Sequence, residues 1–151
     1  MTSADVKLRQ FAEPGASASK PAGAYASFCR CGDLIYSSGV VAREHGKIIA
    51  QVLDEDSIEV GQKAVRLAVT AIFLGLQDEL GSLEQVERVV SLNGFLRTDT
   101  RFASHVKIMD AASLLIQQLF PNTPSPARTT VGVATLPGGG IAEISMIIKV
   151  R

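Results

Sequence analysis

The clearest periodic pattern along the chain is helical and lies between Asp56 and Leu80. Apolar residues recur there at intervals of three and four, the spacing that places side chains on one face of an α-helix. Asp56 and Glu59 have the spacing of a capping box, and Gly81 favours termination. We therefore predict a helix over residues 56–80, with an inner face formed by Val60, Ala64, Leu67, Ala68, Ala71, Leu74 and Leu80.

A second helical pattern runs from about Thr100 to Phe120. Prolines at 121, 124 and 126 cannot continue a helix and are predicted to end it. The inner stripe of this helix is predicted to contain Phe102, Val106, Met109, Ser113, Ile116 and Phe120.

Strand patterns occupy much of the remaining chain. SFCRC and LIYSSGVVA flank Gly32-Asp33, which is typical of a β-hairpin, and VERVVSLNGFL (86–96) has the β-branched, apolar character of a buried strand. SPARTTVGVATLPGGGIAEISMIIKV (125–150) predicts two strands around a Gly-rich turn. REHGK (43–47) is interpreted as a polar turn. Residues 13–25 are rich in Gly, Pro, Ala and Ser, and residues 1–20 are interpreted as an irregular extension.

The predicted order is strands, helix, strand, helix and two strands. Two amphipathic helices on one face of a mixed sheet is the economical packing for that order, which predicts an α+β sandwich. We expect a single domain over residues 1–151, a length sufficient for a hydrophobic core. The second face of the sheet would be left uncovered, so we also expect self-association.

Charge and composition narrow the function classes. Lys+Arg and Asp+Glu both number 15, and this balance argues against a nucleic-acid or membrane surface as partner. No apolar run approaches the roughly 18 residues of a membrane-spanning helix, and MTSADVKLRQ lacks the apolar centre of a signal peptide. A cytoplasmic location is the resulting expectation.

Cysteine and histidine give no metal signature. Cys29 and Cys31 form a lone CxC, interpreted as two reduced thiols whose side chains diverge to opposite faces of an extended segment. His45 and His105 are far apart, and neither has a Cys or His at ligand spacing. We therefore predict no metal site and no disulfide.

Three separated motifs together resemble the RidA/YjgF family, also described as endoribonuclease L-PSP-like. PARTTVGVATLPGGGIAEI is similar to its C-terminal signature, GAYASF to its Gly-Pro-Tyr segment and GDLIYSSG to its Gly-Asp-Leu strand. The motifs occur in the family's order from about residue 20 to 151, and IEVGQKAVRLAV is similar to the helix start of a branch with a longer N-terminus.

The resemblance implies a fold and several functions. It implies a chorismate-mutase-like sandwich with a mixed six-stranded sheet, assembled as a homotrimer with ligand clefts between subunits. The well-understood branch hydrolyses enamines and imines to 2-oxo acids and ammonia without a cofactor. Other relatives are translation inhibitors or endoribonucleases, and a non-catalytic trimer that binds small carboxylates is a further alternative.

The resemblance also implies site residues. Arg128 matches the arginine that binds the substrate carboxylate, and Thr130 occupies the position of an assisting backbone N–H. Glu143 matches the carboxylate that orients or deprotonates the attacking water. Because an iminium carbon is already electrophilic, water, orientation and one proton shuttle would suffice for this reaction.

Further positions match the walls of the family's cleft. Tyr25 matches the tyrosine that closes it, and Ser38 and Gly39 match the pair on its opposite wall. Two positions depart from the pattern: Asp110 stands where the best-known members carry Asn, and Val40 stands where Gln is frequent. A carboxylate at 110 would repel a substrate carboxylate unless it were protonated or turned away, so these departures bear on substrate preference.

The spacing of Arg128 and Glu143 poses a geometric question. In a simple hairpin around residues 137–140, Glu143 would lie roughly 20 Å from Arg128, too far to hold one small substrate. Either the two last strands are not direct neighbours, or the two residues meet across a subunit boundary. The sequence leaves both alternatives open.

Overall fold

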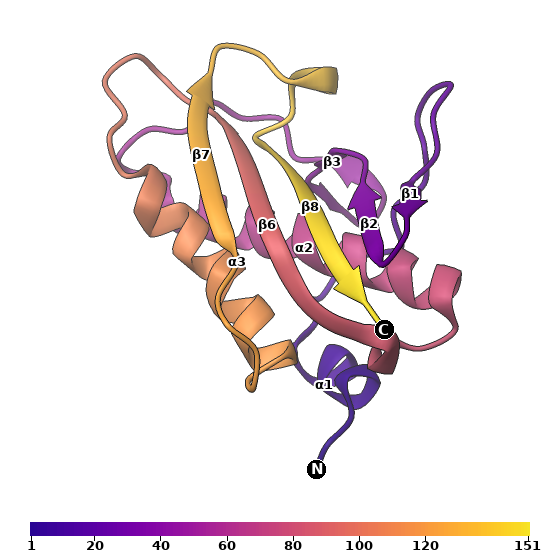
Figure 1. Ribbon diagram of the computed structural model, residues 1–151. Helices are drawn as coiled ribbons and strands as arrows, with labels where there is room; N and C mark the ends of the chain where they lie inside the picture. The colour runs from indigo at the N-terminus through magenta and orange to yellow at the C-terminus, as the bar shows by residue number, and fades with distance from the viewer.

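Six strands form one mixed sheet whose order differs from their order in the chain (Figure 1). The computed structural model describes all residues, 1–151. The main path of the sheet is β1 (Phe28–Cys31), β2 (Leu34–Ser37), β8 (Ala142–Val150), β6 (Val86–Arg97) and β7 (Ala127–Val133), and β3 (Val40–Val41) also pairs with β8. Only the β6–β7 pair is parallel. The two last strands are therefore separated by β6.

Helices α2 (Ile58–Leu80) and α3 (His105–Leu119) pack on one face of this sheet. In the view of Figure 1, α2 passes behind the strands and α3 lies to the left, beside β7. Alternate residues of a strand face the same side, and in β6 and β8 the alternate positions are buried against the helices. This set includes Leu92, Leu96, Ile144, Met146 and Ile148. The predicted α+β architecture, with two helices on one face of a six-stranded mixed sheet, is confirmed.

The opposite face of the sheet carries no covering element within the chain. Phe95 and Ile147 lie on it and are only partly buried. Tyr36, paired with Ile147, and Val131, paired with Phe95, are 43% and 41% exposed. This surface, from Tyr36 to Val131, is called the open face below.

The N-terminal residues correct one prediction. Residues 1–20 are not irregular throughout, because Ala4–Phe11 form helix α1. Ser3 caps this helix by accepting a hydrogen bond from the N–H of Val6, and Leu8 is buried in the core. Residues 13–25 contain neither helix nor strand, as predicted.

The helix boundaries also differ in part from the predictions. Helix α2 begins at Ile58 rather than Asp56, and the expected capping box is wrong because Asp54 accepts from both the N–H of Asp56 and the hydroxyl of Ser57. The stop at Gly81 is confirmed, with the left-handed φ of 81° that glycine tolerates.

Helix α3 begins at His105 rather than near Thr100. Glu55 accepts hydrogen bonds from the N–H of Ala103 and the hydroxyl of Ser104, which holds the preceding segment outside the helix. The predicted inner faces of α2 and α3 also include residues that are not buried, because Val60 and Val106 are 41% and 62% exposed.

Short elements complete the chain. The predicted polar turn lies between β4 (Arg43–Glu44) and β5 (Lys47–Ile48), and its central residues His45 and Gly46 have positive φ. Two single-turn 3₁₀ helices are η1 (Leu83–Gln85) and η2 (Pro137–Gly139). None of the helices has the length and apolar character needed to cross a bilayer.

The two cysteines lie in β1 as exposed free thiols. The expectation that they point to opposite faces is wrong. Residues two apart in a strand point to the same side, and Cys29 and Cys31 both belong to the regular pairing of β1 with β2.

Candidate functional site

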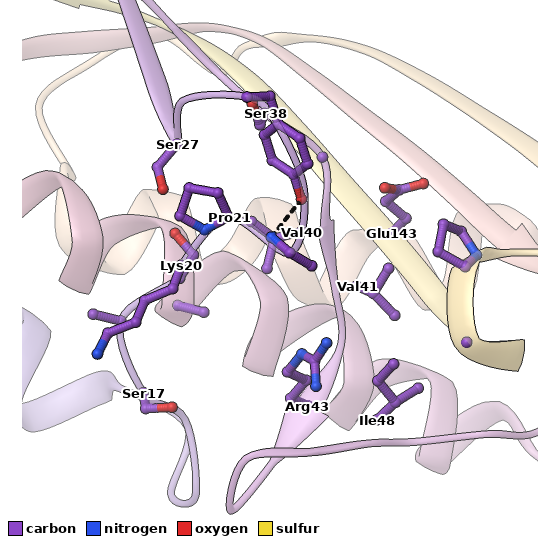
Figure 2. Close-up of a pocket in the computed structure, with 18 residues that line it drawn as sticks. Ser17, Lys20, Pro21, Ser27, Ser38, Val40, Val41, Arg43, Ile48 and Glu143 are labelled. Carbon is purple, nitrogen blue, oxygen red and sulfur yellow. Dashed lines mark hydrogen bonds between the residues drawn. The ribbon is translucent and has the colours of Figure 1, made fainter.

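A cavity of about 780 Å³ opens beside β3, where that strand pairs with β8 (Figure 2). Its walls come from five parts of the chain: the irregular segment 17–27, residues 38–48, Ala71 of α2, the turn at Pro137–Gly138 and the start of β8. Four residues expected at the site from the family resemblance line it: Tyr25, Ser38, Gly39 and Glu143.

Glu143 is the only carboxylate in the cavity wall. It lies in β8, in register with Val41 on one side and Phe95 on the other, and its side chain is half-buried. Burial raises the pKa of the Glu143 carboxyl above its usual 4.5, because desolvation disfavours the charged form. A carboxyl group in this state is suited to accept a proton from water and return it.

Gly39 makes room for that carboxyl group. A Cβ added at Gly39 would lie 2.5 Å from Oε1 of Glu143, a distance that real Cβ atoms do not adopt. Ser38 fixes the neighbouring backbone, since its Oγ donates to the carbonyl of Ala26 at 2.6 Å and its N–H donates to the carbonyl of Ser27. The Ser-Gly pair thus ties the irregular segment to the strand and leaves space for Glu143.

Tyr25 forms part of the same wall through the irregular segment. Tyr25 is 50% exposed, and its hydroxyl accepts a hydrogen bond of 3.1 Å from the N–H of Ala22, dashed in Figure 2. This bond closes a small loop onto the ring and fixes where the hydroxyl lies at the cavity edge.

Arg128 lies elsewhere, on the helix side of β7. It pairs in register with the buried Leu92, and its Nη1 donates to Oδ1 of Asp110 at 2.9 Å and to Oγ of Ser113 at 2.8 Å, both on α3. Thr130 points to the same side, and its hydroxyl is buried without a hydrogen-bond partner. The chain therefore gathers Arg128, Asp110 and Thr130 in one group, apart from the cavity.

The two groups lie on opposite faces of the sheet. Glu143 pairs with Phe95 on the open face, whereas Arg128 pairs with Leu92 on the helix face. With β6 between their strands and a three-residue offset, their Cα atoms are roughly 14 Å apart. The first of the two open alternatives is correct, because the strands are not neighbours, yet one chain still does not place both residues around one small substrate.

Two cations of the cavity wall were missed by sequence reasoning: Lys20 and Arg43. Both lie in segments that were interpreted as irregular or as a turn, and no motif singles them out. No group of three or more His, Cys, Asp or Glu side chains is arranged to hold a metal ion.

The chain belongs to the family described as Endoribonuclease L-PSP, whose sequence profile matches residues 15–150. This is the family that the three sequence motifs indicated. A curated relative is Protein TCP17 of Trypanosoma cruzi, which is 30% identical over 138 residues, or 89% of this chain and 86% of that protein.

Solved structures share the fold. The protein Atu1372 of Agrobacterium tumefaciens, described as having unknown function, is 30% identical with a TM-score of 0.87, over 98% of this chain and 95% of that one. TdcF of E. coli is 18% identical with a TM-score of 0.60, over 91% and 94% of the two chains, and its structure was solved with bound serine. At that identity TdcF shows the shared fold alone.

Proposed function

We propose that the protein is an enamine/imine deaminase that hydrolyses 2-imino acids to 2-oxo acids and ammonia. The observation that carries the proposal is Glu143, a half-buried carboxyl with a raised pKa inside a cavity of about 780 Å³. Tyr25, Ser38 and Gly39, which the resemblance assigns to the substrate cleft, line the same cavity.

Imine hydrolysis requires one group that moves protons between water and the imine nitrogen, and Glu143 is proposed for this role. Glu143 as the carboxylate takes a proton from water while the water oxygen attacks the electrophilic C=N carbon. The resulting carbinolamine carries its hydroxyl and amine on one carbon. The protonated Glu143 then returns the proton to nitrogen. As the C–N bond breaks and ammonia leaves, the hydroxyl oxygen forms the C=O bond and its proton passes to the Glu143 carboxylate, which releases it to the departing ammonia.

In this proposal the protein is a homotrimer, and Arg128 of a neighbouring subunit binds the substrate carboxylate. Only Nη1 of Arg128 is used by Asp110 and Ser113, so Nε and Nη2 remain for a substrate carboxylate. Asp110 then orients the guanidinium rather than facing the substrate. The uncovered open face and the placement of Arg128 and Glu143 on opposite faces both support an assembly in which two chains complete each site.

The bound serine of TdcF is consistent with a cleft for a small amino-acid-like ligand. Thr130 and Asp110 remain proposed as supporting residues around Arg128 and not as groups that react.

The test generates 2-imino acids in situ with an amino-acid oxidase and measures how much imine escapes to a chemical trap. Wild type is expected to divert imine to 2-oxo acid, and Glu143→Gln and Arg128→Ala are expected to lose this activity, whereas the exposed Arg101→Ala keeps it. Full activity in both site variants would contradict the proposal. Thermal stabilisation by 2-oxo acids without turnover would instead indicate a non-catalytic carboxylate-binding trimer, and RNA cleavage abolished by Glu143→Gln would indicate the endoribonuclease alternative.

A further inference from the structure

The cavity beside Glu143 carries an excess of positive charge. Its lining contains two cations, Lys20 and Arg43, against the single carboxylate of Glu143. We infer that Arg43 selects substrates with a second carboxylate, so that the preferred substrate is the imine of a dicarboxylic amino acid. This inference rests on the proposed deaminase function and names the substrate class of that site.

The guanidinium of Arg43 is free to bind an anion. Its one side-chain hydrogen bond runs from Nη1 to the carbonyl of Gly46 at 3.3 Å, and it makes no ion pair. The adjacent Glu44 is already paired with Lys63. Nε and Nη2 of Arg43 therefore have no partner within the chain, and these are the donors that a carboxylate would accept as a fork.

The positions of Arg43 and Glu143 fit a substrate whose second carboxylate reaches Arg43 while its C=N carbon lies near Glu143. Val41 pairs directly with Glu143, and Arg43 follows two residues later, roughly 7 Å along an extended chain. Figure 2 shows the Arg43 guanidinium and the Glu143 carboxylate well separated, on different sides of Val41. In the imine of glutamate, two methylene groups separate the C=N carbon from the second carboxylate, which is a separation of this order.

The size and lining of the cavity agree with a longer substrate. Pockets of roughly 300–1,000 Å³ hold ligands of drug size, so about 780 Å³ exceeds the needs of a three- or four-carbon imino acid. Val41 and Ile48 line the wall near Arg43 and offer apolar contact to the methylene groups of a longer side chain. Apart from Lys20, Arg43 and Glu143, the polar side chains of the lining are neutral hydroxyls, so no second carboxylate offsets the positive charge.

The kinetic test compares two imines of equal chain length, formed in situ from glutamate and from norvaline. Wild type is expected to prefer the glutamate imine in kcat/KM. Arg43→Ala is expected to lose roughly 10- to 100-fold on that imine, the range of one charge-assisted hydrogen-bond pair, with little change on the norvaline imine. Arg43→Lys keeps the charge without the fork and is expected to fall between the two.

Arg30→Ala is the matched control. Arg30 is also exposed, and its Nε donates to a turn carbonyl, that of Gly32, just as Arg43 donates to Gly46. It lies outside the cavity lining, so the variant removes an equal charge without touching the site. A preference of wild type for the norvaline imine, or an equal effect of Arg43→Ala on both imines, would overturn the inference.

A binding measurement separates this inference from the proposed function. If no imine is hydrolysed, the deaminase proposal fails, and the selectivity is then tested by calorimetric titration with 2-oxoglutarate and 2-oxopentanoate. Tighter binding of 2-oxoglutarate, lost in Arg43→Ala and kept in Arg30→Ala, would support the inference as a ligand preference. Equal affinity for the two acids in wild type would refute it.

Discussion

At the scale of single residues, the site depends on a carboxyl group held partly away from water. Glu143 lies in a strand whose alternate residues form the core, and it faces the other side, where the cavity leaves it half-buried. Burial alone accounts for the rise of its pKa. The same burial that raises the pKa of Glu143 therefore costs stability when the group is ionised.

The pH dependence of that cost is the first prediction. Because the folded-state pKa of Glu143 is raised above 4.5, the folded protein holds this proton more tightly than the unfolded chain. The stability from Glu143 is thus fully present below about pH 4.5 and is lost as pH rises through the raised pKa. Glu143→Gln cannot ionise at this position and does not lose this stability. The Tm of the variant minus the Tm of wild type should therefore increase between about pH 4 and pH 7. A relative Tm that falls over this interval would contradict the raised pKa.

The pH dependence of imine hydrolysis by wild type should also report the ionisation of Glu143. The reaction needs the carboxylate form, so kcat/KM is expected to fall as pH drops through the raised pKa of Glu143, with a midpoint above 4.5. A pH–rate profile measured with a trapped imine substrate checks this, and a flat profile down to about pH 4 would remove Glu143 as the base.

Gly39 gives a further test at the scale of single residues. In Gly39→Ala the new methyl group would meet Oε1 of Glu143 at 2.5 Å, so the carboxyl group must move. A displacement of about 1 Å at a reacting group costs on the order of 100-fold, and a loss of this size in kcat is expected. Tm should change little, because the cavity is open and the carboxyl group can turn into it. Unchanged kcat would show that the position of Glu143 does not matter.

Only part of the candidate site could be predicted from the sequence. Tyr25, Ser38, Gly39 and Glu143 stand in motifs and do line one cavity. Arg43 was missed because its neighbourhood arises from the pairing of β3 with β8, which joins residues about 100 positions apart. A single sequence shows residue types and periodicity, but it does not show which distant strands pair.

At the scale of elements, regular patterns were predictable and short or context-dependent ones were not. The hairpin at Gly32-Asp33, the strand from Val86 and the helix stop at Gly81 carry local signals and are confirmed. Helix α1 has only eight residues, too few for a strong periodic pattern, and depends on tertiary contacts. Val60 and Val106 were misplaced because helical spacing alone leaves the edge of an apolar stripe undefined.

Asp5 makes several of the polar contacts that hold α1 against the rest of the chain, and it gives a prediction at the scale of elements. It accepts from Gln77 and Ser82 side chains and from the N–H of Leu83. Burial raises the pKa of the Asp5 carboxyl, but the hydrogen bonds from Ser82, Leu83 and Gln77 outweigh it and hold the pKa below 3.8. Asp5→Ala should therefore destabilise the protein by about 1–3 kcal/mol at neutral pH.

The sign of the pH effect distinguishes Asp5 from Glu143. Since the folded-state pKa of Asp5 is lowered, its contribution is present above about pH 4 and is lost as pH falls through the lowered value. The gap in Tm between wild type and Asp5→Ala should close on acidification. Asp78→Ala, which removes an exposed carboxylate near the end of α2, is the control and should leave Tm nearly unchanged. An equal loss in both variants would mean that α1 is not held by Asp5.

At the scale of the whole molecule, the chain has one covered and one uncovered sheet face. The helix face buries the alternate residues of β6 and β8, whereas the open face leaves Tyr36 and Val131 more than two-fifths exposed. An uncovered apolar sheet face is typical of a surface that another chain covers. The proposed trimer would bury this face and bring Arg128 of one subunit to the cavity of the next.

A pair of valines tests this assembly. Val131 on the open face and Val60 on the helix layer are both 41% exposed, so Val→Glu at each adds the same charge at the same exposure. Val131→Glu is expected to place a carboxylate in a subunit interface, where desolvation of an unpaired charge opposes association. Its molar mass by light scattering should shift from trimer toward monomer, and imine hydrolysis should fall with it, because Glu143 would lose the neighbouring Arg128. Val60→Glu should remain a trimer with full activity. An active monomer in Val131→Glu would mean that one chain suffices for catalysis, and a dissociated Val60→Glu would move the interface to the helix layer.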